Sequence, residues 1–463
     1  MKEQSAAEKE LSILINNDDE ELNHIFNEDK SSSPLQRNNQ ELEGPKIPKV
    51  PDMLRKLKTN EGCFDPRVVS IGPYHHGNPE LQEVEKLKTK LAKQYCGNPS
   101  AAAELYRRVK EVAGEARGFY DMEGLDIDDK AFTKIMFLDG CFILVFITCL
   151  VGEAEYHAMG MKNNVIANVK RDLFLLENQL PYIVLKALMD KRQYWKMMIE
   201  IFITICRRLP PPVLAVPWWS STRDKSPLHL LDMTRTRFVN QSATNQGRKS
   251  SQILLETDAK QFDRSRSILI WSNDWYSYHS ARVLQSMGIW FKPNKTGSFS
   301  DVKFESQLVR GVLTLPPILI DASTKSVLLN LLAFESSHNN LADMQGVTSY
   351  MCFMDSLIDH AEDVMILRSQ NVIVNCLGTD QQVADLFNDI ASNLVPNPHT
   401  YAEAKRGIQK HCNNQFKKWM AECLHTHFRS PWTLLALGGA IFVIMLTAAQ
   451  TYLAARPPKT LND

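Results

Sequence analysis

Apolar side chains recur at intervals of three and four residues through the first half of the chain, which is the period of a helix with one buried face. Asn78 followed by Pro79 is typical of a helix N-terminus, because the asparagine caps the first turn and proline needs no hydrogen-bonded N–H there. A run of three prolines, 210–212, ends the last helical segment. We therefore predict helices over residues 78–95, 105–119, 131–151, 166–190 and 194–209.

The pattern changes in the second half. A short helix is predicted over 226–238, and the Ser-, Thr-, Asn- and Gln-rich stretch 236–266 has little period and is interpreted as a variable loop within a linker, 210–275. Alternating apolar and polar residues then predict short strands in "GIWFK", "SDVKFES" and "GVLTLPPILI", with "KPNKTGS" as a turn. Further helices are predicted over 278–287, 323–336, 348–368, 379–394 and 399–428, with caps at Ser323 and Thr379. The expected fold class is mainly α with a small antiparallel β element (α+β).

The C-terminal region contains the longest uncharged apolar run of the chain, Thr433–Ala455. At a rise of about 1.5 Å per residue, this run is long enough to cross a hydrocarbon core of about 30 Å. Trp432 and Tyr452 fall near its two edges, and Arg429 and Arg456 bracket it. We expect one transmembrane helix over 433–455, in contact with membrane lipid, followed by a short tail, 456–463.

A second apolar run, Ile135–Val151, is interrupted by Asp139 and Gly140. The uninterrupted part is short for a bilayer crossing, and a carboxylate in lipid is costly. We predict a buried core helix there.

The expected orientation places the bulk of the chain in the cytosol. The N-terminal sequence has no signal-peptide core, and basic residues are more frequent before the apolar run than after it. The plasma membrane is the first expectation and an internal membrane the second. Sequons at Asn240 ("NQS") and Asn294 ("NKT") test this orientation, since a glycan on either would reverse it.

Composition limits the classes of function. The 463 residues include 53 basic and 53 acidic side chains, a balance that argues against a nucleic-acid partner. The nine cysteines are scattered without a C-x-x-C pair, so we expect reduced, buried thiols. Residues 1–46 are polar and acidic and are expected to form a disordered tail. Residues 47–430 then form one α-rich domain, with a helical first half, 47–209, and an α+β second half, 276–430.

No phosphate-binding loop, nucleophile elbow, dinucleotide fingerprint or H-E-x-x-H motif occurs. Some polar residues nevertheless lie in apolar or turn contexts. His75 and His76 in "PYHHG" offer imidazoles for metal binding or proton transfer, but adjacent side chains diverge and no further ligand stands at metal-binding spacing, so helix-entry packing is favoured. Asp139 and Cys141 in "FLDGC" lie in a Phe-, Ile- and Leu-rich run, where a cysteine is more often structural than catalytic.

The stretch "LLENQLP" carries residue types used in acid–base chemistry, since apolar neighbours can raise the pKa of Glu177. Buried polar groups are more often satisfied structurally, so we interpret Glu177, Asn178 and Gln179 as polar clamps around a helix kink at Pro181. His229 and Asp232 in "HLLDMTR" are three residues apart and are expected to make a local polar contact. No catalytic, cofactor-binding or metal-binding residue is assigned, and no cofactor is expected.

These stretches make the chain resemble the plant family called domain of unknown function 247, or uncharacterised protein family 0481. The resemblance runs from about Ile47 to Leu453 and is carried by "VVSIGPYHHGNPELQEVEKLK", "FTKIMFLDGCFILVFI", "VKRDLFLLENQLPYIVLKAL", "HLLDMTR", "GIWFK", "GVLTLPPILIDAST", "NLLAFE", "TSYMCFMDSLIDHAEDV" and "VIVNCLG". The family's "NPW" before the C-terminal span is "SPW" here. The resemblance implies one α-rich domain with a C-terminal anchor and no established activity or catalytic residues, with some grass members implicated in self-incompatibility and others in growth or stress.

Two functions remain open on the sequence. The leading expectation is a membrane-anchored, non-enzymatic interaction or signalling protein with unidentified protein partners, in which 236–266 displays specificity. The alternative is a membrane-tethered enzyme or small-molecule binder with a pocket near His75, His76, Asp139 and Glu177.

Overall fold

The computed structural model describes residues 46–152, 159–189, 192–207, 226–239, 279–307, 310–337, 346–392, 394–397, 400–414 and 431–454. The chain divides into two units, Met1–Lys46 and Ile47–Asp463, and the described elements belong to the second. Residues 1–45 of the predicted tail 1–46, most of the variable loop 236–266, Asn240, Arg429 and Arg456 lie outside the described residues.

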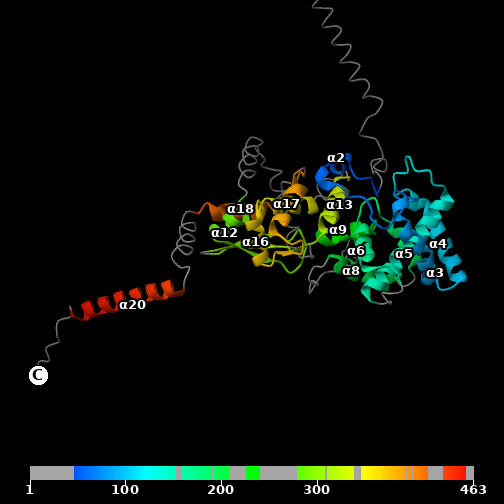
Figure 1. The fold of residues 1–463 in the computed structure, drawn as a ribbon. Coiled ribbons are helices and arrows are strands. Elements are labelled where there is room, and N and C mark those ends of the chain that lie inside the picture. Colours follow the sequence, from blue (N-terminus) through cyan, green and yellow to red (C-terminus); the bar gives the residue numbers. More distant parts are fainter. Residues whose placement is uncertain are drawn as a thin grey trace, which may run out of the picture. The chain divides into compact units, whose positions relative to one another are not determined.

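The described part is mostly helical (Figure 1). Its helices are α2 (Asp52–Arg55), α3 (Gln82–Cys96), α4 (Pro99–Arg117), α5 (Asp129–Val151), α6 (Asn163–Asp172), α7 (Tyr182–Leu188), α8 (Arg192–Arg207), α9 (Leu230–Val239), α12 (Ala281–Ser286), α13 (Thr324–Ser336), α15 (Gly346–Asp355), α16 (Ala361–Ser369), α17 (Asp380–Ala391), α18 (Ala402–Cys412) and α20 (Pro431–Ala454), with 3-10 turns η2 (Lys58–Asn60) and η3 (Pro79–Leu81). The strands are β1 (Ile289–Pro293), β2 (Lys303–Ser306), β3 (Gly311–Leu315), β4 (Ile318–Ile320) and β5 (Ile373–Asn375).

Helix α5 is the central helix of the first half and contacts α3, α4, α7 and α8. It is the one helix among the searched residues that has the length and hydropathy of a membrane span, but 67% of its most apolar window is buried, as expected for a core helix. The apolar part described for α20, Gly438–Tyr452, is shorter than the predicted transmembrane helix 433–455. Gly140 allows a close approach of α7, because a Cβ there would overlap the Leu188 Cδ1 atom, which would have to move. The prediction of a buried core helix at 135–151 is confirmed.

The strands form two small sheets, and the predicted antiparallel element is only partly correct. In the first sheet, of order β1-β3-β2, β1 runs parallel to β3 and β2 runs antiparallel to it. In the second, β4 and β5 are parallel. Alternation along a strand predicts which face is buried but not which strand is its neighbour. The strands β1 and β2, on either side of the predicted turn "KPNKTGS", are not paired with each other. Pro316 and Pro317 divide "GVLTLPPILI" into two strands that belong to different sheets.

Helix ends follow their local capping signals. The Asn78 side chain accepts a hydrogen bond from the Glu80 N–H at 3.0 Å, and Thr379 forms a capping box with Gln382, so both predicted caps are confirmed. Ser323 makes no capping hydrogen bond, because its hydroxyl donates to Asp321 at 2.7 Å instead.

Two predicted helices are interrupted. The predicted helix 348–368 is divided into α15 and α16, and at the start of α16 the Asp363 carboxylate accepts a hydrogen bond from the His360 N–H at 3.2 Å. The predicted helix 166–190 is divided into α6 and α7 by a connection, 173–181, that is not helical. The helical spacing of apolar residues in the sequence continues across both breaks, because a buried loop also carries apolar side chains. The predicted helix 399–428 is represented by α18, and residues 415–430 lie outside the described part.

Candidate functional site

The segments that carry the sequence motifs are brought together by buried polar side chains. The first of these is Asp172 at the end of α6, which is fully buried. Its Oδ2 accepts hydrogen bonds from three successive backbone N–H groups, of Arg67, Val68 and Val69, at 2.9, 2.8 and 3.2 Å. Burial raises the pKa of the Asp172 carboxyl, while the Val68 N–H and the adjacent Arg171 guanidinium oppose that shift. Asp172 therefore fixes residues 67–69, which lead into "SIGPYHH".

Asn178 and Gln179 continue this attachment. Asn178 Oδ1 accepts from the Ile71 N–H at 2.7 Å, and its Nδ2 donates to the Val69 and Asp172 carbonyls at 3.1 and 2.9 Å. Gln179 Oε1 accepts from the Leu231 N–H at 2.9 Å and thereby joins the "LLENQLP" connection to α9. Residues 173–181 are not helical, so buried backbone groups here and in the neighbouring segments lack helical partners. The side-chain amides of Asn178 and Gln179 supply hydrogen bonds to several of them.

Pro181 does not kink a helix. It occupies the residue before α7, with φ −56° and ψ 133°. Pro51, at the corresponding position before α2, has φ −56° and ψ 134°. The predicted kink is wrong, because the chain leaves helical geometry at Leu173 and re-enters it at Tyr182. Polar clamps are present, but they hold a loop between two helices.

Glu177 anchors the N-terminal end of the domain. Its Oε1 accepts from the Val50 N–H at 2.7 Å, and its Oε2 accepts from Arg55 Nη2 at 2.7 Å. His75 Nε2 lies 3.6 Å from the same Oε2. Burial lowers the pKa of His75, and the Glu177 carboxylate opposes the shift only in part. His76, in contrast, is exposed, so the two adjacent imidazoles do not act together.

Asp139 and Lys88 form a buried ion pair between α5 and α3, with only 2% and 1% of each residue exposed. Lys88 Nζ lies 2.6 Å from Asp139 Oδ1, 2.5 Å from Glu85 Oε1 and 2.5 Å from the Ser70 carbonyl oxygen. Asp139 Oδ2 accepts from the Gly72 N–H at 2.8 Å. Burial raises the pKa of the Asp139 carboxyl, and Lys88 opposes that shift. The ammonium donates hydrogen bonds to Asp139 and to the Ser70 carbonyl, and Glu85 adds an ion-pair contact whose Oε1 accepts no hydrogen bond.

The turn at Gly72 fits closely against the same connection. Gly72 has φ +75°, and a Cβ there would lie 2.9 Å from both the Gln179 carbonyl oxygen and the Tyr120 hydroxyl. The Tyr120 hydroxyl itself donates to the Gln179 carbonyl at 2.9 Å. Only glycine combines this backbone conformation with this approach.

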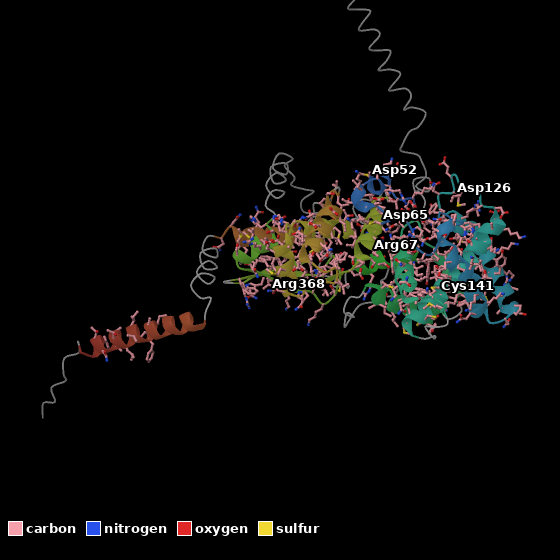
Figure 2. The ribbon with its side chains drawn as sticks, viewed as in Figure 1. Asp52, Asp65, Arg67, Asp126, Cys141 and Arg368 are labelled. Atoms are coloured by element: carbon pink, nitrogen blue, oxygen red, sulfur yellow. The ribbon has the colours of Figure 1, made fainter. Side chains whose placement is uncertain are left out.

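The remaining candidates occupy structural positions. His229 and Asp232 lie at the start of α9, where His229 Nδ1 accepts from the Asp232 N–H at 3.3 Å and Asp232 Oδ2 accepts from the Leu228 N–H at 2.9 Å. The His229 ring packs edge-on against Phe334, with centroids 4.8 Å apart. Cys141, on α5, is fully buried, and burial raises the pKa of its thiol (Figure 2).

Sequence reasoning missed Asp172 and Lys88. A signal for Lys88 existed, because this lysine stands on the apolar stripe of its helix, between Val84 and Leu91 at helical spacing. Asp172 had no such signal, since a charged residue at the end of a helix is ordinary.

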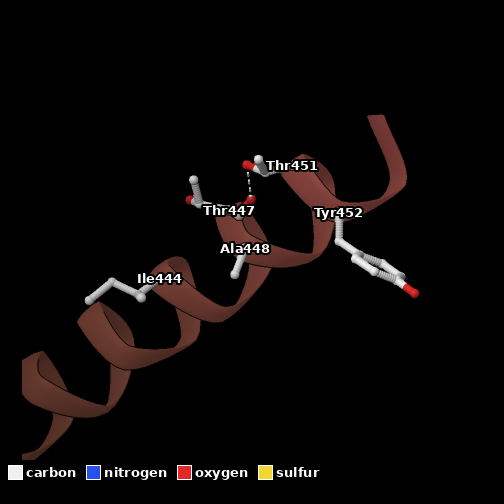
Figure 3. A pocket seen from close by; sticks show the side chains of 5 residues that line it. All are labelled: Ile444, Thr447, Ala448, Thr451 and Tyr452. Carbon is white, nitrogen blue, oxygen red and sulfur yellow. Dashed lines mark hydrogen bonds between the residues drawn. The ribbon is translucent and has the colours of Figure 1, made fainter. Parts of the chain in front are cut away.

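The network offers little for ligand chemistry. No group of three or more His, Cys, Asp or Glu side chains is arranged to hold a metal ion in the part of the chain that the structure describes. A depression lies along α20 and is lined by Ile444, Thr447, Ala448, Thr451 and Tyr452 (Figure 3). All five belong to one helix, so this depression is the side of a helix and does not enclose a ligand. Tyr452 is exposed there, and the Trp432 side chain lies outside the described part.

Comparison with known proteins agrees with the motifs. A family model described as a plant protein of unknown function, DUF247, matches residues 47–446. The UPF0481 protein At3g47200 of Arabidopsis thaliana is 28% identical over 422 residues, which cover 88% of this chain and 85% of the relative. The putative UPF0481 protein At3g02645 of the same plant is 23% identical over 511 residues, covering 94% of each. No solved structure matches the chain significantly. Since this family model covers most of the chain, the protein belongs to the DUF247 family of plant proteins of unknown function.

Proposed function

We propose that this protein is a non-enzymatic interaction or signalling component, tethered to a membrane by α20, with the domain that precedes α20 in the cytosol. The plasma membrane is the first site we propose, and an internal membrane the second. The motif network then serves to hold the domain together, and binding to protein partners takes place on its surface.

The character of α20 carries the proposal of a tether. This helix has 24 residues, and the side chains from Ile441 to Leu446 are each between 47% and 67% exposed. Exposed apolar surface costs about 25 cal/mol per Å² in water, so such a helix favours an apolar environment. At about 1.5 Å per residue, its length of about 36 Å matches a bilayer core.

The polar side chains of α20 are compatible with lipid. Thr447 Oγ1 donates to the Val443 carbonyl at 2.8 Å, and Thr451 Oγ1 donates to the Thr447 carbonyl at 2.8 Å. Each hydroxyl is therefore satisfied within its own helix, as a membrane requires.

The surroundings of Asn294 support the cytosolic orientation. Its Nδ2 donates to the Asp301 carbonyl at 2.9 Å, and its Oδ1 accepts from the Gly297 N–H at 2.9 Å. The residue is only 9% exposed. A glycan on Nδ2 would displace these contacts, so the folded loop is incompatible with glycosylation of this sequon.

The hydrogen bonds of Lys88 and Asp139 support a non-enzymatic role. Lys88 donates to Asp139 and to a backbone carbonyl, and Asp139 also accepts from a backbone N–H. In the same region His75 Nε2 and Glu85 Oε1 make no hydrogen bond. A catalytic acid or base must instead be free to exchange a proton with a substrate. In this proposal these side chains hold the packed segments of the domain together and do not act on a substrate.

The tether is tested by fractionating cells that express the full chain or a variant lacking 431–454. The full chain should stay with membranes after alkaline carbonate extraction, and the deletion variant should become soluble. Protease added to sealed microsomes should digest the domain, and Asn294 should carry no glycan. Carbonate-soluble full-length protein or a protected, glycosylated domain would contradict the proposal.

The interaction role is tested by proximity labelling with the tether intact, comparing the full chain with a variant lacking 236–266. A matched control carries only 431–454 on the labelling enzyme, so that general membrane neighbours are subtracted. Reproducible partners that depend on 236–266 are expected. A partner set identical to that of the control would argue against the role.

One observation favours the alternative of a small-molecule site, namely the approach of His75 to Glu177 and Arg55. In this alternative, His75→Ala would abolish ligand binding or activity while the protein stayed fully folded. In the role proposed above, His75→Ala leaves the partner set unchanged apart from any loss of stability.

A further inference from the structure

The N-terminal strap, residues 47–56, begins the domain and is attached to it at Glu177. Ile47 and Val50 of the strap are buried. The Val50 N–H donates to Glu177 Oε1 at 2.7 Å, and Arg55 Nη2, on α2, donates to Glu177 Oε2 at 2.7 Å. One carboxylate therefore binds both the start of the strap and its helix, and it is the point at which the strap is held or released.

The imidazole ring of His75 lies beside this attachment point. Its Nε2 atom is buried and makes no hydrogen bond to any residue that the structure describes. This atom lies 3.6 Å from Glu177 Oε2, the oxygen that already accepts from Arg55. The preceding residue also holds the strap, because the Tyr74 hydroxyl donates to the Ile47 carbonyl at 2.7 Å. A change of charge on His75 therefore acts directly on the contacts of the strap.

We propose that His75 makes the strap acid-labile, so that protonation of its imidazole releases residues 47–56 while the rest of the fold stays intact. The buried position suits the neutral ring. The imidazolium would have to leave water and stand beside the Arg55 guanidinium, which repels it. In the released state His75 is hydrated and takes up the proton without this cost. The device depends neither on the tether nor on a partner protein.

The charged groups around His75 decide the direction of the effect. Glu177, from the connection 173–181, and Asp65 favour the imidazolium, whereas Arg55 disfavours it. Burial outweighs these charges and holds the pKa of His75 below its ordinary value of 6.5. The released form therefore binds the proton more tightly than the closed form. The stability of the closed strap is present above the ordinary pKa and is lost as pH falls below it.

The buried carboxyls nearby respond to acid in the opposite direction. Burial raises the pKa of Asp172, which holds residues 67–69, and of Asp139, which accepts from the Gly72 N–H. A carboxyl with a raised pKa binds its proton more tightly in the folded state, so acid favours the folded form of these attachments. A loss of attachment on acidification therefore distinguishes His75 from both carboxyls.

The experiment measures hydrogen exchange of the full chain in one detergent by mass spectrometry, at about pH 7.5, 6.5 and 5.5, on both sides of the ordinary histidine pKa. Rates are corrected for the pH dependence of exchange in an unstructured peptide, so that the remaining protection reports local opening. Protection of peptides covering 47–56 should fall by up to about tenfold per pH unit below about 6.5, because release takes up one proton. Peptides from α17 should keep their protection.

Histidine variants make the result specific. His75→Gln removes the titrating group, so the protection of the strap should be the same at all three pH values, and His75→Asn repeats the test with a smaller side chain. His76→Gln is the matched control, because His76 is adjacent but exposed, and this variant should behave like the wild type.

Three outcomes would overturn the proposal. The first is a wild-type strap whose protection does not change with pH. The second is a wild-type fall in protection that persists in His75→Gln and His75→Asn. The third is a loss of protection in α17 by the same factor as in the strap, because acid would then unfold the whole domain and not release one segment.

Discussion

The buried pair of Lys88 and Asp139 gives the sharpest test of how this fold is held together. Lys88→Met keeps the length of the side chain but removes the ammonium from Asp139, Glu85 and the Ser70 carbonyl. Breaking one partner of a buried ion pair costs about 3–5 kcal/mol, because an uncompensated charge remains in the interior. We expect the free energy of unfolding to fall by that amount near neutral pH.

The loss should depend on pH in a stated direction. Burial already raises the pKa of the Asp139 carboxyl above its ordinary value of 3.8, and removing Lys88 takes away the charge that opposes the shift. A carboxyl with a raised folded-state pKa binds its proton more tightly when folded, so stability is highest at low pH and falls as pH rises above the unfolded pKa. The variant should therefore lose more stability at neutral pH than at mildly acidic pH.

The assay is urea unfolding of the full chain in one detergent, followed by circular dichroism at both pH values. Arg107→Met is the matched control, since Arg107 forms ion pairs with Glu104 and Glu111 on the neighbouring α4 but has 59% of its side chain exposed. Exposed pairs contribute about 0–1 kcal/mol. Adding Asp139→Asn to Lys88→Met should recover part of the loss, because the buried charge is then gone. The reasoning is refuted if Lys88→Met costs no more than Arg107→Met, or if the double variant is no more stable than Lys88→Met.

Further predictions concern the connection, the turn and the second half. Asn178→Ala should lower the free energy of unfolding by about 1–3 kcal/mol, because the Ile71 N–H loses its buried acceptor; unchanged urea unfolding with lost partner binding would indicate a direct role. Gly72→Ala should cost about 1–3 kcal/mol from backbone strain at φ +75°, and more from the contact with the Gln179 carbonyl, as a lower thermal midpoint. Asp355 has its pKa raised to about 6 by burial, so stability should fall as pH rises from about 4 to about 6 and then level off. The effect should be only ~1 kcal/mol because the carboxyl is half exposed, and Asp355→Asn should abolish it in unfolding curves across this pH range; a wild-type pH dependence in Asp355→Asn would contradict the assignment.

The location of the functional motifs illustrates the limits of prediction from local pattern. Asn178 and Gln179 were recognised as structural clamps, since polar amides in an apolar run need partners. Their partners, the N–H groups of Ile71 and Leu231, are more than 50 residues away in the sequence. Periodicity gave no information about such distant groups, so it extended a helix through 173–181 where the chain forms a loop.

The sequence by itself determined the mainly helical class, the core position of Ile135–Val151, the caps at Asn78 and Thr379, and the family, because each depends on residues close together along the chain or on long motifs. Only the tertiary structure decided that β3 lies between β1 and β2, that Lys88 pairs with Asp139, and that Asp172 binds the segment before Gly72. The physical reason is that a buried donor or acceptor must find a partner wherever the packed chain supplies one, and local sequence does not encode which distant segment that is.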